Sequence, residues 1–146
     1  IIQRQTNQGS DLFFKEIRES YGMSHIYKRS SINQSYKVLK QNQILILASD
    51  QDAKDKGVIV NFFNHKTSVP KGAALFHLKT GAALIFSVSI KNADGSMAIS
   101  FEELKIEDSP TVESITQAYT KMLEDKISKN PDHYFWFHRK WKSTIS

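Results

Sequence analysis

The sequence predicts a mixed α/β fold in which a largely parallel sheet is flanked by helices, with one antiparallel hairpin. Three observations support this prediction: apolar runs alternate with helical patterns, one run is apolar throughout, and a four-residue turn signal separates two further runs. The chain has 146 residues, 40% of them hydrophobic and 24% charged. That composition and length fit a single globular domain over residues 1–146.

In the N-terminal third of the chain, the sequence pattern predicts short strands that alternate with helices. Residues 1–5 and 23–27 are weak strand candidates. Ser10 is the candidate N-cap of a first helix, whose apolar positions recur at helical spacing until a glycine ends it. Ser31 is the candidate cap of a second helix. The run Ile44–Ser49 is then the strand expected to be buried on both faces.

The remaining elements are a strand, a helix, a hairpin and a long final helix. Pro70 suits the first turn of a helix that a glycine ends after Thr80. Asn92-Ala93-Asp94-Gly95 is a hairpin turn signal. The final helix has an apolar face at helical spacing. The expected ranges are 58–63 for the strand, 83–90 and 96–101 for the hairpin, and Ser109-Pro110 to Asn130-Pro131 for the final helix.

Charge and missing motifs narrow the functional classes. The net charge of +5 favours anionic partners without choosing between nucleic acid, a phospholipid surface and acidic small molecules. The absence of cysteine excludes disulfides and thiolate chemistry. The longest aliphatic run, residues 44–48, is far shorter than the ~20 residues of a spanning helix. None of the five histidines has an acidic residue five positions on, and no phosphate loop or nucleophile elbow occurs, so the chain shows no self-contained catalytic dyad or triad.

The first candidate site is Asp50-Gln51-Asp52, directly after the apolar run. Ligands of open α/β sheets gather at the carboxyl ends of strands, and two carboxylates there could bind a divalent cation. The segment also resembles the Asp-x-Asp motif of nucleotide-sugar glycosyltransferases. In the simpler interpretation, Asp50 caps a turn and Asp52 is solvated.

Two further segments carry polar groups that suit an anion. The hydroxyls of Thr67 and Ser68 lie ahead of a helix N-terminus, where they either help to hold an anion or cap the helix. Residues 130–142 hold both tryptophans among basic side chains. Their rings could stack on bases or lie beside a lipid, or simply pack, and Arg139 is suited to bidentate phosphate contact or is solvated.

These segments together resemble the lipid A biosynthesis lauroyl/myristoyl acyltransferase family, in its C-terminal half. The family has an Asp-Gln-Asp-like strand end, a Gly-Val-x-Val-x-Phe-Phe-Gly strand, a Thr-Pro-x-Gly-x-Ala helix start with a later Thr-Gly-Ala, and a closing Pro-x-x-Tyr-x-Trp-x-His-Arg-Arg-Trp-Lys signature. The matching segments are Ala48–Asp52, Gly57–Asn64, Val69–Ala74 with Thr80–Ala82, and Pro131–Lys142. The chain departs from the family pattern at Asn64, Val69, His133 and Lys140.

The resemblance implies a glycerolipid acyltransferase-like fold that is incomplete in this chain. The whole enzyme would transfer a fatty acyl chain from acyl carrier protein or acyl-CoA to a hydroxyl of a lipid A precursor or related lipid. It would act at the cytoplasmic face of the bacterial inner membrane, without a metal or organic cofactor. The catalytic His-x-x-x-x-Asp/Glu pair and a membrane anchor are expected upstream of Ile1, so residues 1–146 alone are expected to be inactive.

The resemblance also assigns the substrate-binding residues. Arg18 and Arg139 would hold anionic groups of the lipid or of the carrier's phosphopantetheine, and Asp50, Gln51 and Ser68 would complete the site. The partners are then a lipid acceptor, an acyl donor and a membrane surface, with no nucleic acid. Two alternatives stay open: a glycosyltransferase that binds manganese through Asp50 and Asp52, and a basic nucleic-acid-binding module that uses the aromatic segment.

Overall fold

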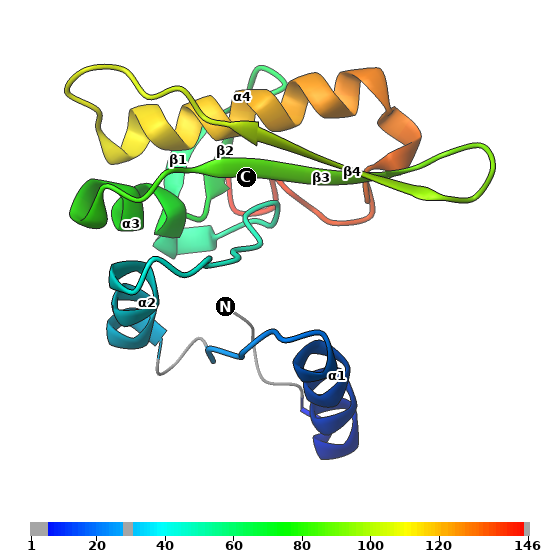
Figure 1. The fold of residues 1–146 in the computed structure, drawn as a ribbon. Helices are drawn as coiled ribbons and strands as arrows, with labels where there is room; N and C mark the ends of the chain where they lie inside the picture. The colour runs from blue at the N-terminus through cyan, green and yellow to red at the C-terminus, as the bar shows by residue number, and fades with distance from the viewer. Residues whose placement is uncertain (1–5, 28–30, 145–146) are drawn as a thin grey trace. The chain divides into compact units, whose positions relative to one another are not determined.

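The computed structural model describes residues 6–27 and 31–144, and the chain divides into two compact units, Ile1–Ala48 and Ser49–Ser146. The N-terminal unit contains helices α1 (Gln8–Ser20) and α2 (Ser31–Lys40). The C-terminal unit contains η1 (Lys54–Lys56), β1 (Val58–Phe62), β2 (His65–Val69), α3 (Gly72–Thr80), β3 (Ile85–Lys91), β4 (Met97–Glu103), α4 (Val112–Lys129) and η2 (Pro131–His133) (Figure 1). The single domain predicted from the sequence stays a prediction.

The helices of the N-terminal unit lie close to where the sequence predicts them. The N-cap of α1 is Asn7, whose side chain accepts a hydrogen bond from the Ser10 amide at 3.0 Å. The prediction that Ser10 is the cap is therefore wrong, because an equally suitable capping residue precedes it by three positions. Gly22 follows α1 with a φ of 76°, as expected of a glycine at a helix end. α2 begins at Ser31, as predicted.

The predicted parallel sheet is not found in the described part of the chain. The two sheets are separate antiparallel hairpins, β1–β2 and β3–β4. The run Ile44–Ser49 forms neither helix nor strand, and Ile44 and Ile46 are 89% and 65% exposed. An apolar run is a central strand only where sheet neighbours and covering layers bury it, and here they do not. Residues 23–27 also form no strand, and residues 1–5 lie outside the described residues.

The β1–β2 hairpin is tightly specified by its turn. Its register runs from Val58↔Val69 to Phe62↔His65, so two residues, Phe63 and Asn64, form the connection. Their φ angles are 48° and 62°, which suits the strand twist of a two-residue hairpin. β1 was predicted, but β2 was not, because its sequence has more polar than apolar residues.

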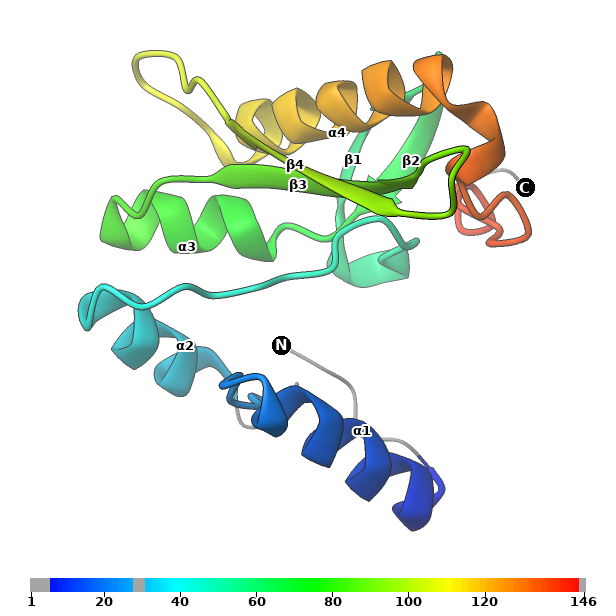
Figure 2. The ribbon, with the colours of Figure 1, turned by 45° about the vertical axis from the view of Figure 1, so that its right-hand side comes forward.

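The core of the C-terminal unit forms where α4 packs on β1 and α3 (Figure 2). Val112 and Tyr119 of α4 pack against both of its clusters. The Gln117 side chain also makes two hydrogen bonds with the Asn61 backbone, at 2.8 and 2.9 Å, which fix α4 along β1. The buried members of the two clusters are Val58, Val60 and Val69, and Ala74, Leu104 and Ile115.

The ends of the other elements agree closely with the sequence. A capping box between Thr111 and Ser114 begins α4, just after the predicted start. α3 begins two residues after Pro70, and Gly81 closes it with a φ of 69°. The β3–β4 hairpin is confirmed, and its turn is closed by a 2.8 Å hydrogen bond from the Asn92 amide to the carbonyl of residue 96.

Candidate functional site

A buried lysine lies at the centre of the candidate site. The Lys140 side chain is only 1% exposed, and its Nζ donates hydrogen bonds to the carbonyl oxygens of Asp50 at 2.7 Å and Gln51 at 3.2 Å. The ammonium lies 5.9 Å from the centre of the Phe62 ring. The Lys140 backbone carbonyl accepts a 2.9 Å hydrogen bond from the buried Thr67 hydroxyl. Lys140 therefore connects the C-terminal segment to β1, β2 and the segment that precedes them.

The environment of Lys140 disfavours its charge. Burial lowers the pKa of Lys140 to about 8, although the charges of Asp50 and Asp52 raise it in part. Near neutral pH the side chain is still mostly an ammonium ion. Two peptide carbonyls and the face of an aromatic ring replace the water that this ion would otherwise bind.

Asp52 fixes the same segment from its other end. Its amide donates to His138 Nε2 at 3.0 Å, so that ring nitrogen carries no proton. Its carboxylate accepts hydrogen bonds from the Ser143 hydroxyl at 2.6 Å, the Ser143 amide at 3.1 Å and the Lys54 amide at 2.9 Å. His138, Lys140 and Ser143 thus hold residues 50–52, and we call these three residues the C-terminal clasp.

The Asp52 carboxylate is a structural group in this arrangement. Partial burial raises its pKa, but the hydrogen bonds from Ser143 and Lys54 outweigh that effect and lower the pKa below its ordinary value. Its oxygens are already engaged with protein donors. In residues 6–27 and 31–144, no group of three or more His, Cys, Asp or Glu side chains could hold a metal ion.

Ser68 lies inside the fold and not in a loop ahead of α3. It belongs to β2, is fully buried, and its hydroxyl donates to the Lys54 carbonyl at 2.5 Å. Its own carbonyl accepts from the Ala53 amide at 3.1 Å. These bonds attach Ser68 to residues 53 and 54, which follow Asp50-Gln51-Asp52 in the chain. Its predicted contact with substrate stays a prediction.

The aromatic side chains of the C-terminal segment divide into two groups. Trp141 and Tyr134 pack on Phe62, with ring centres 5.5 and 6.3 Å apart. Burial, with the nearby Asp50 charge, raises the pKa of Tyr134 to about 12. Phe135 and Phe137 are instead 68% and 89% exposed. The packing interpretation holds for the first group, whereas the second presents apolar surface.

Three of the predicted substrate-binding residues lie in the two segments that the clasp joins. Asp50, Gln51 and Arg139 are exposed. Within the part of the chain that the structure describes, no hydrogen bond or ion pair engages the Arg139 guanidinium. Arg139 directly precedes Lys140, whose ammonium binds the carbonyls of Asp50 and Gln51. Arg18 belongs to the last turn of α1 in the N-terminal unit and lies 5.5 Å from the Phe14 ring centre.

The sequence did not identify the clasp as a support. His138 and Lys140 occur in the closing signature and Ser143 follows it, but nothing in their spacing shows that they reach residues 50–52, 86 to 91 positions away. The one signal in the sequence was that both segments match motifs of the same family, as segments of a shared site would. It did not specify which atoms meet.

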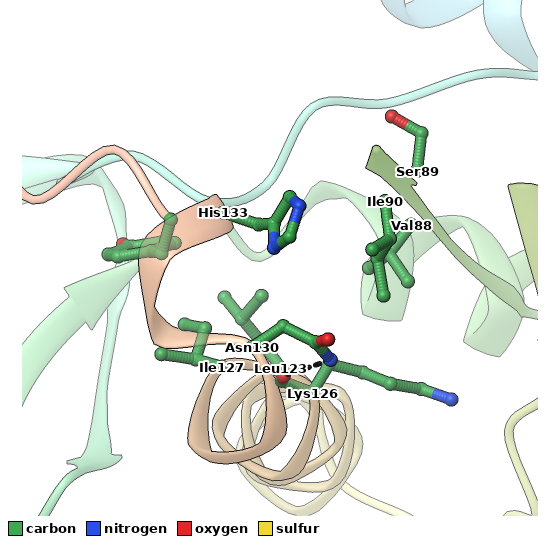
Figure 3. Close-up of a pocket in the computed structure, with 9 residues that line it drawn as sticks. Val88, Ser89, Ile90, Leu123, Lys126, Ile127, Asn130 and His133 are labelled. Carbon is green, nitrogen blue, oxygen red and sulfur yellow. Dashed lines mark hydrogen bonds between the residues drawn. The ribbon is translucent and has the colours of Figure 1, made fainter. Parts of the chain in front are cut away.

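A small pocket lies between β3, α4 and η2 (Figure 3). Its volume is about 90 Å³, room for roughly three water molecules. Two of its polar side chains already have partners: Lys126 pairs with Glu102 at 3.2 Å, and His133 Nε2 lies 3.0 Å from the Lys91 carbonyl. This pocket is a packing gap and is too small for a long ligand.

Comparison with known proteins gives one consistent class. The sequence model of the bacterial lipid A biosynthesis acyltransferase family matches residues 1–143. The chain is 31% identical to a lipid A biosynthesis palmitoleoyltransferase of Escherichia coli over 108 residues, 72% of this chain and 35% of that protein. It is 28% identical to a phosphatidylinositol mannoside acyltransferase of Mycolicibacterium smegmatis over 137 residues, 91% of this chain and 45% of that protein. The chain thus spans less than half the length of these curated relatives.

Proposed function

Because the chain belongs to the bacterial lipid A biosynthesis acyltransferase family, we propose that it forms the lipid- and anion-binding part of an enzyme that esterifies a lipid with a fatty acyl chain. The observation that carries this proposal is that Asp50, Gln51 and Arg139 are exposed on two segments that the buried Lys140 side chain joins. Such a rigid support under free polar side chains suits a binding site, because it limits the ordering cost of binding.

Each exposed side chain has a chemical role in this proposal. The Arg139 guanidinium takes an anionic group, with the planar fork that suits phosphate. Asp50 and Gln51 hydrogen-bond hydroxyls of the lipid head group. Arg18 is the second cation for anionic groups of the lipid or of the carrier's phosphopantetheine, and Ser68 supports the site through its hydrogen bond to the Lys54 carbonyl.

The reaction needs a general base that none of the five histidines supplies with a carboxylate five positions on. We assign this role to a His-x-x-x-x-Asp/Glu pair outside residues 1–146. The histidine takes the proton of the acceptor hydroxyl, and the oxygen attacks the thioester carbonyl of the donor. An ester bond forms, the carbon–sulfur bond breaks, and the donor thiol leaves with a proton. Neither a metal nor an organic cofactor takes part.

The acceptor that we propose is a lipid A precursor or a related lipid, and the donor is acyl carrier protein or acyl-CoA. The family description and the Escherichia coli relative support this choice, while the mycobacterial relatives are named for phosphatidylinositol mannoside. The enzyme would act on the cytoplasmic face of the bacterial inner membrane. The exposed rings of Phe135 and Phe137 beside Arg139 suit an anionic lipid surface. No described helix is long and apolar enough to cross a membrane.

The two other functions considered from the sequence lose their support. A manganese-dependent glycosyltransferase needs free carboxylates at Asp50 and Asp52, but Asp52 is bound by Ser143 and Lys54. A nucleic-acid-binding module would use the aromatic rings for stacking, but Tyr134 and Trp141 pack on Phe62, which leaves exposed rings such as Phe135 and Phe137 for that role. Family membership agrees with neither function.

The test is an acyl-transfer assay with the full native protein. Acyl carrier protein and acyl-CoA donors are each paired with a lipid A precursor and with phosphatidylinositol mannoside as acceptors. We expect ester formation on one acceptor class and none with residues 1–146 alone. A folded native protein that transfers no acyl group to either acceptor would contradict the proposed function, and turnover by residues 1–146 alone would contradict the assignment of the general base.

A further inference from the structure

Lys140 makes an unusual set of contacts for a lysine. Its side chain is 1% exposed, and two of its three N–H donors are used by the carbonyls of consecutive residues, Asp50 and Gln51. Two consecutive carbonyls that converge on one buried cation fix the orientation of both peptide groups. The side chains of the same two residues are exposed.

A hydrophobic side chain of similar size could occupy this space without the cost of burying a charge. Burying an ammonium ion costs several kcal/mol, and replacing buried ions by apolar groups of similar size is often neutral or stabilising. The lowered pKa shows that this cost is present. The contacts of Lys140 are therefore better explained by the geometry that they impose on Asp50 and Gln51.

We propose that Lys140 is a positioning residue: it holds the backbone of Asp50 and Gln51 from inside the fold, so that their side chains face the lipid head group beside Arg139. This inference rests on the proposed function. The lysine ammonium is a point charge, so two carbonyl oxygens can share it. The Phe62 ring lies against the ammonium on its remaining side. His138 and Ser143 hold the next residue, Asp52, and limit the movement of the segment.

The strength of the hydrogen bonds from Lys140 to the carbonyls of Asp50 and Gln51 depends on pH, because the charge of Lys140 does. The groups that act on it are the carboxylates of Asp50 and Asp52 and the Phe62 ring, with His138 and Ser143 on Asp52. Above pH 8 the ammonium loses its proton, and a neutral amine donates weaker hydrogen bonds to the carbonyls. An arginine at this position would stay charged throughout this range.

The experiment compares Lys140→Met and Lys140→Arg with wild type in the full native protein. Acceptor KM and kcat are measured from pH 7 to pH 9.5, and Lys129→Met, which removes an exposed lysine of α4, is the matched control. We expect Lys140→Met to raise the acceptor KM about tenfold with little change in kcat, because binding is lost equally in ground and transition states. Lys140→Arg should restore most of the affinity. Wild-type KM should rise above pH 8, while the KM of Lys140→Arg stays flat.

Hydrogen exchange at residues 50–54 is measured on the same samples and needs no activity. Faster exchange at residues 50–54 in Lys140→Met, with wild-type rates in Lys140→Arg, supports the proposal that Lys140 holds this backbone in place. Equal exchange in all proteins overturns the proposal, as does a wild-type KM in Lys140→Met. If Lys140→Met does not fold, identical pH dependence of KM in wild type and Lys140→Arg overturns it instead. A wild-type protein without acyl transfer contradicts the proposed function, and the exchange rates then still decide whether Lys140 holds the segment.

Discussion

The Lys140 ammonium donates a hydrogen bond to the Asp50 carbonyl at 2.7 Å, across 90 positions of the chain. This bond joins the closing signature to the segment that follows the apolar run Ile44–Ser49. His138 and Ser143 reinforce the connection through Asp52. Two motifs that are separate in the sequence are therefore held together in the fold.

Lys140 should give the stability of the protein a characteristic pH dependence. Its folded pKa of about 8 lies below its ordinary value of 10.5, so between these values the unfolded chain binds a proton that the folded chain has lost. The free energy of unfolding then rises with pH in this window, by at most about 1.4 kcal/mol per pH unit. Urea unfolding from pH 7.5 to 10 should show this rise in wild type relative to Lys140→Met. Parallel curves for the two proteins would show that Lys140 keeps an ordinary pKa.

Ser143→Ala tests the attachment of Asp52. The variant loses the 2.6 Å hydrogen bond to the carboxylate, so the pKa of Asp52 should rise toward its ordinary value. A depressed carboxyl pKa stabilises the folded state above the unfolded pKa, and this stability is lost as pH falls through the folded value. We expect a loss of about 1 kcal/mol at pH 7 that shrinks toward pH 3. Ser100→Ala, on exposed β4, is the control, and an equal effect of both variants at both pH values would contradict the assignment.

Gly57→Ala should destabilise the support behind the site. An added Cβ would overlap the Ser68 hydroxyl and come within 2.8 Å of the Val69 carbonyl, so the strand backbone must shift. We expect a loss of about 1–3 kcal/mol, as in other overpacked sites. Thermal unfolding measures it. Gly72→Ala is the matched control, because its Cβ meets no atom within 4 Å and alanine favours a helix, so this variant should be neutral or stabilising.

Arg139→Ala should reduce activity without reducing stability. The guanidinium makes no hydrogen bond or ion pair in the described part of the chain, and such a surface change usually alters stability by less than about 0.5 kcal/mol. Loss of its contact with the anionic group should raise the acceptor KM about tenfold or more. Arg139→Lys should restore only part of the lost affinity for the acceptor, because lysine cannot form the bidentate contact. Wild-type kinetics of Arg139→Ala in the acyl-transfer assay would remove this residue from the site.

Local patterns in the sequence predicted the helices well. Gly81 ends α3 with a positive φ, and the turn at residues 92–95 forms the predicted hairpin. Both outcomes depend on residues a few positions apart. Asn7 replaced Ser10 as a cap because both are good caps, and only the structure shows which side chain reaches the amide.

Pairing and burial could not be predicted in the same way. The apolar run Ile44–Ser49 has the composition of a buried strand, but Ile44 is 89% exposed. The polar segment His65–Val69 has weak strand character, yet the Phe63-Asn64 turn pairs it with β1 and buries Thr67 and Ser68. Strand formation depends on a partner, which a local pattern does not contain.

The sequence by itself determined the family, the positions of the helices and the residue types that suit an anionic lipid, because these follow from motifs and local periodicity. Tertiary structure decided which of those residues are available. It buried Lys140 and Ser68, used Asp52 as an anchor, and left Asp50, Gln51 and Arg139 exposed. The physical reason is that a hydrogen bond or a buried charge is a relation between groups distant in the chain, and only folding brings such groups within 3 Å of each other.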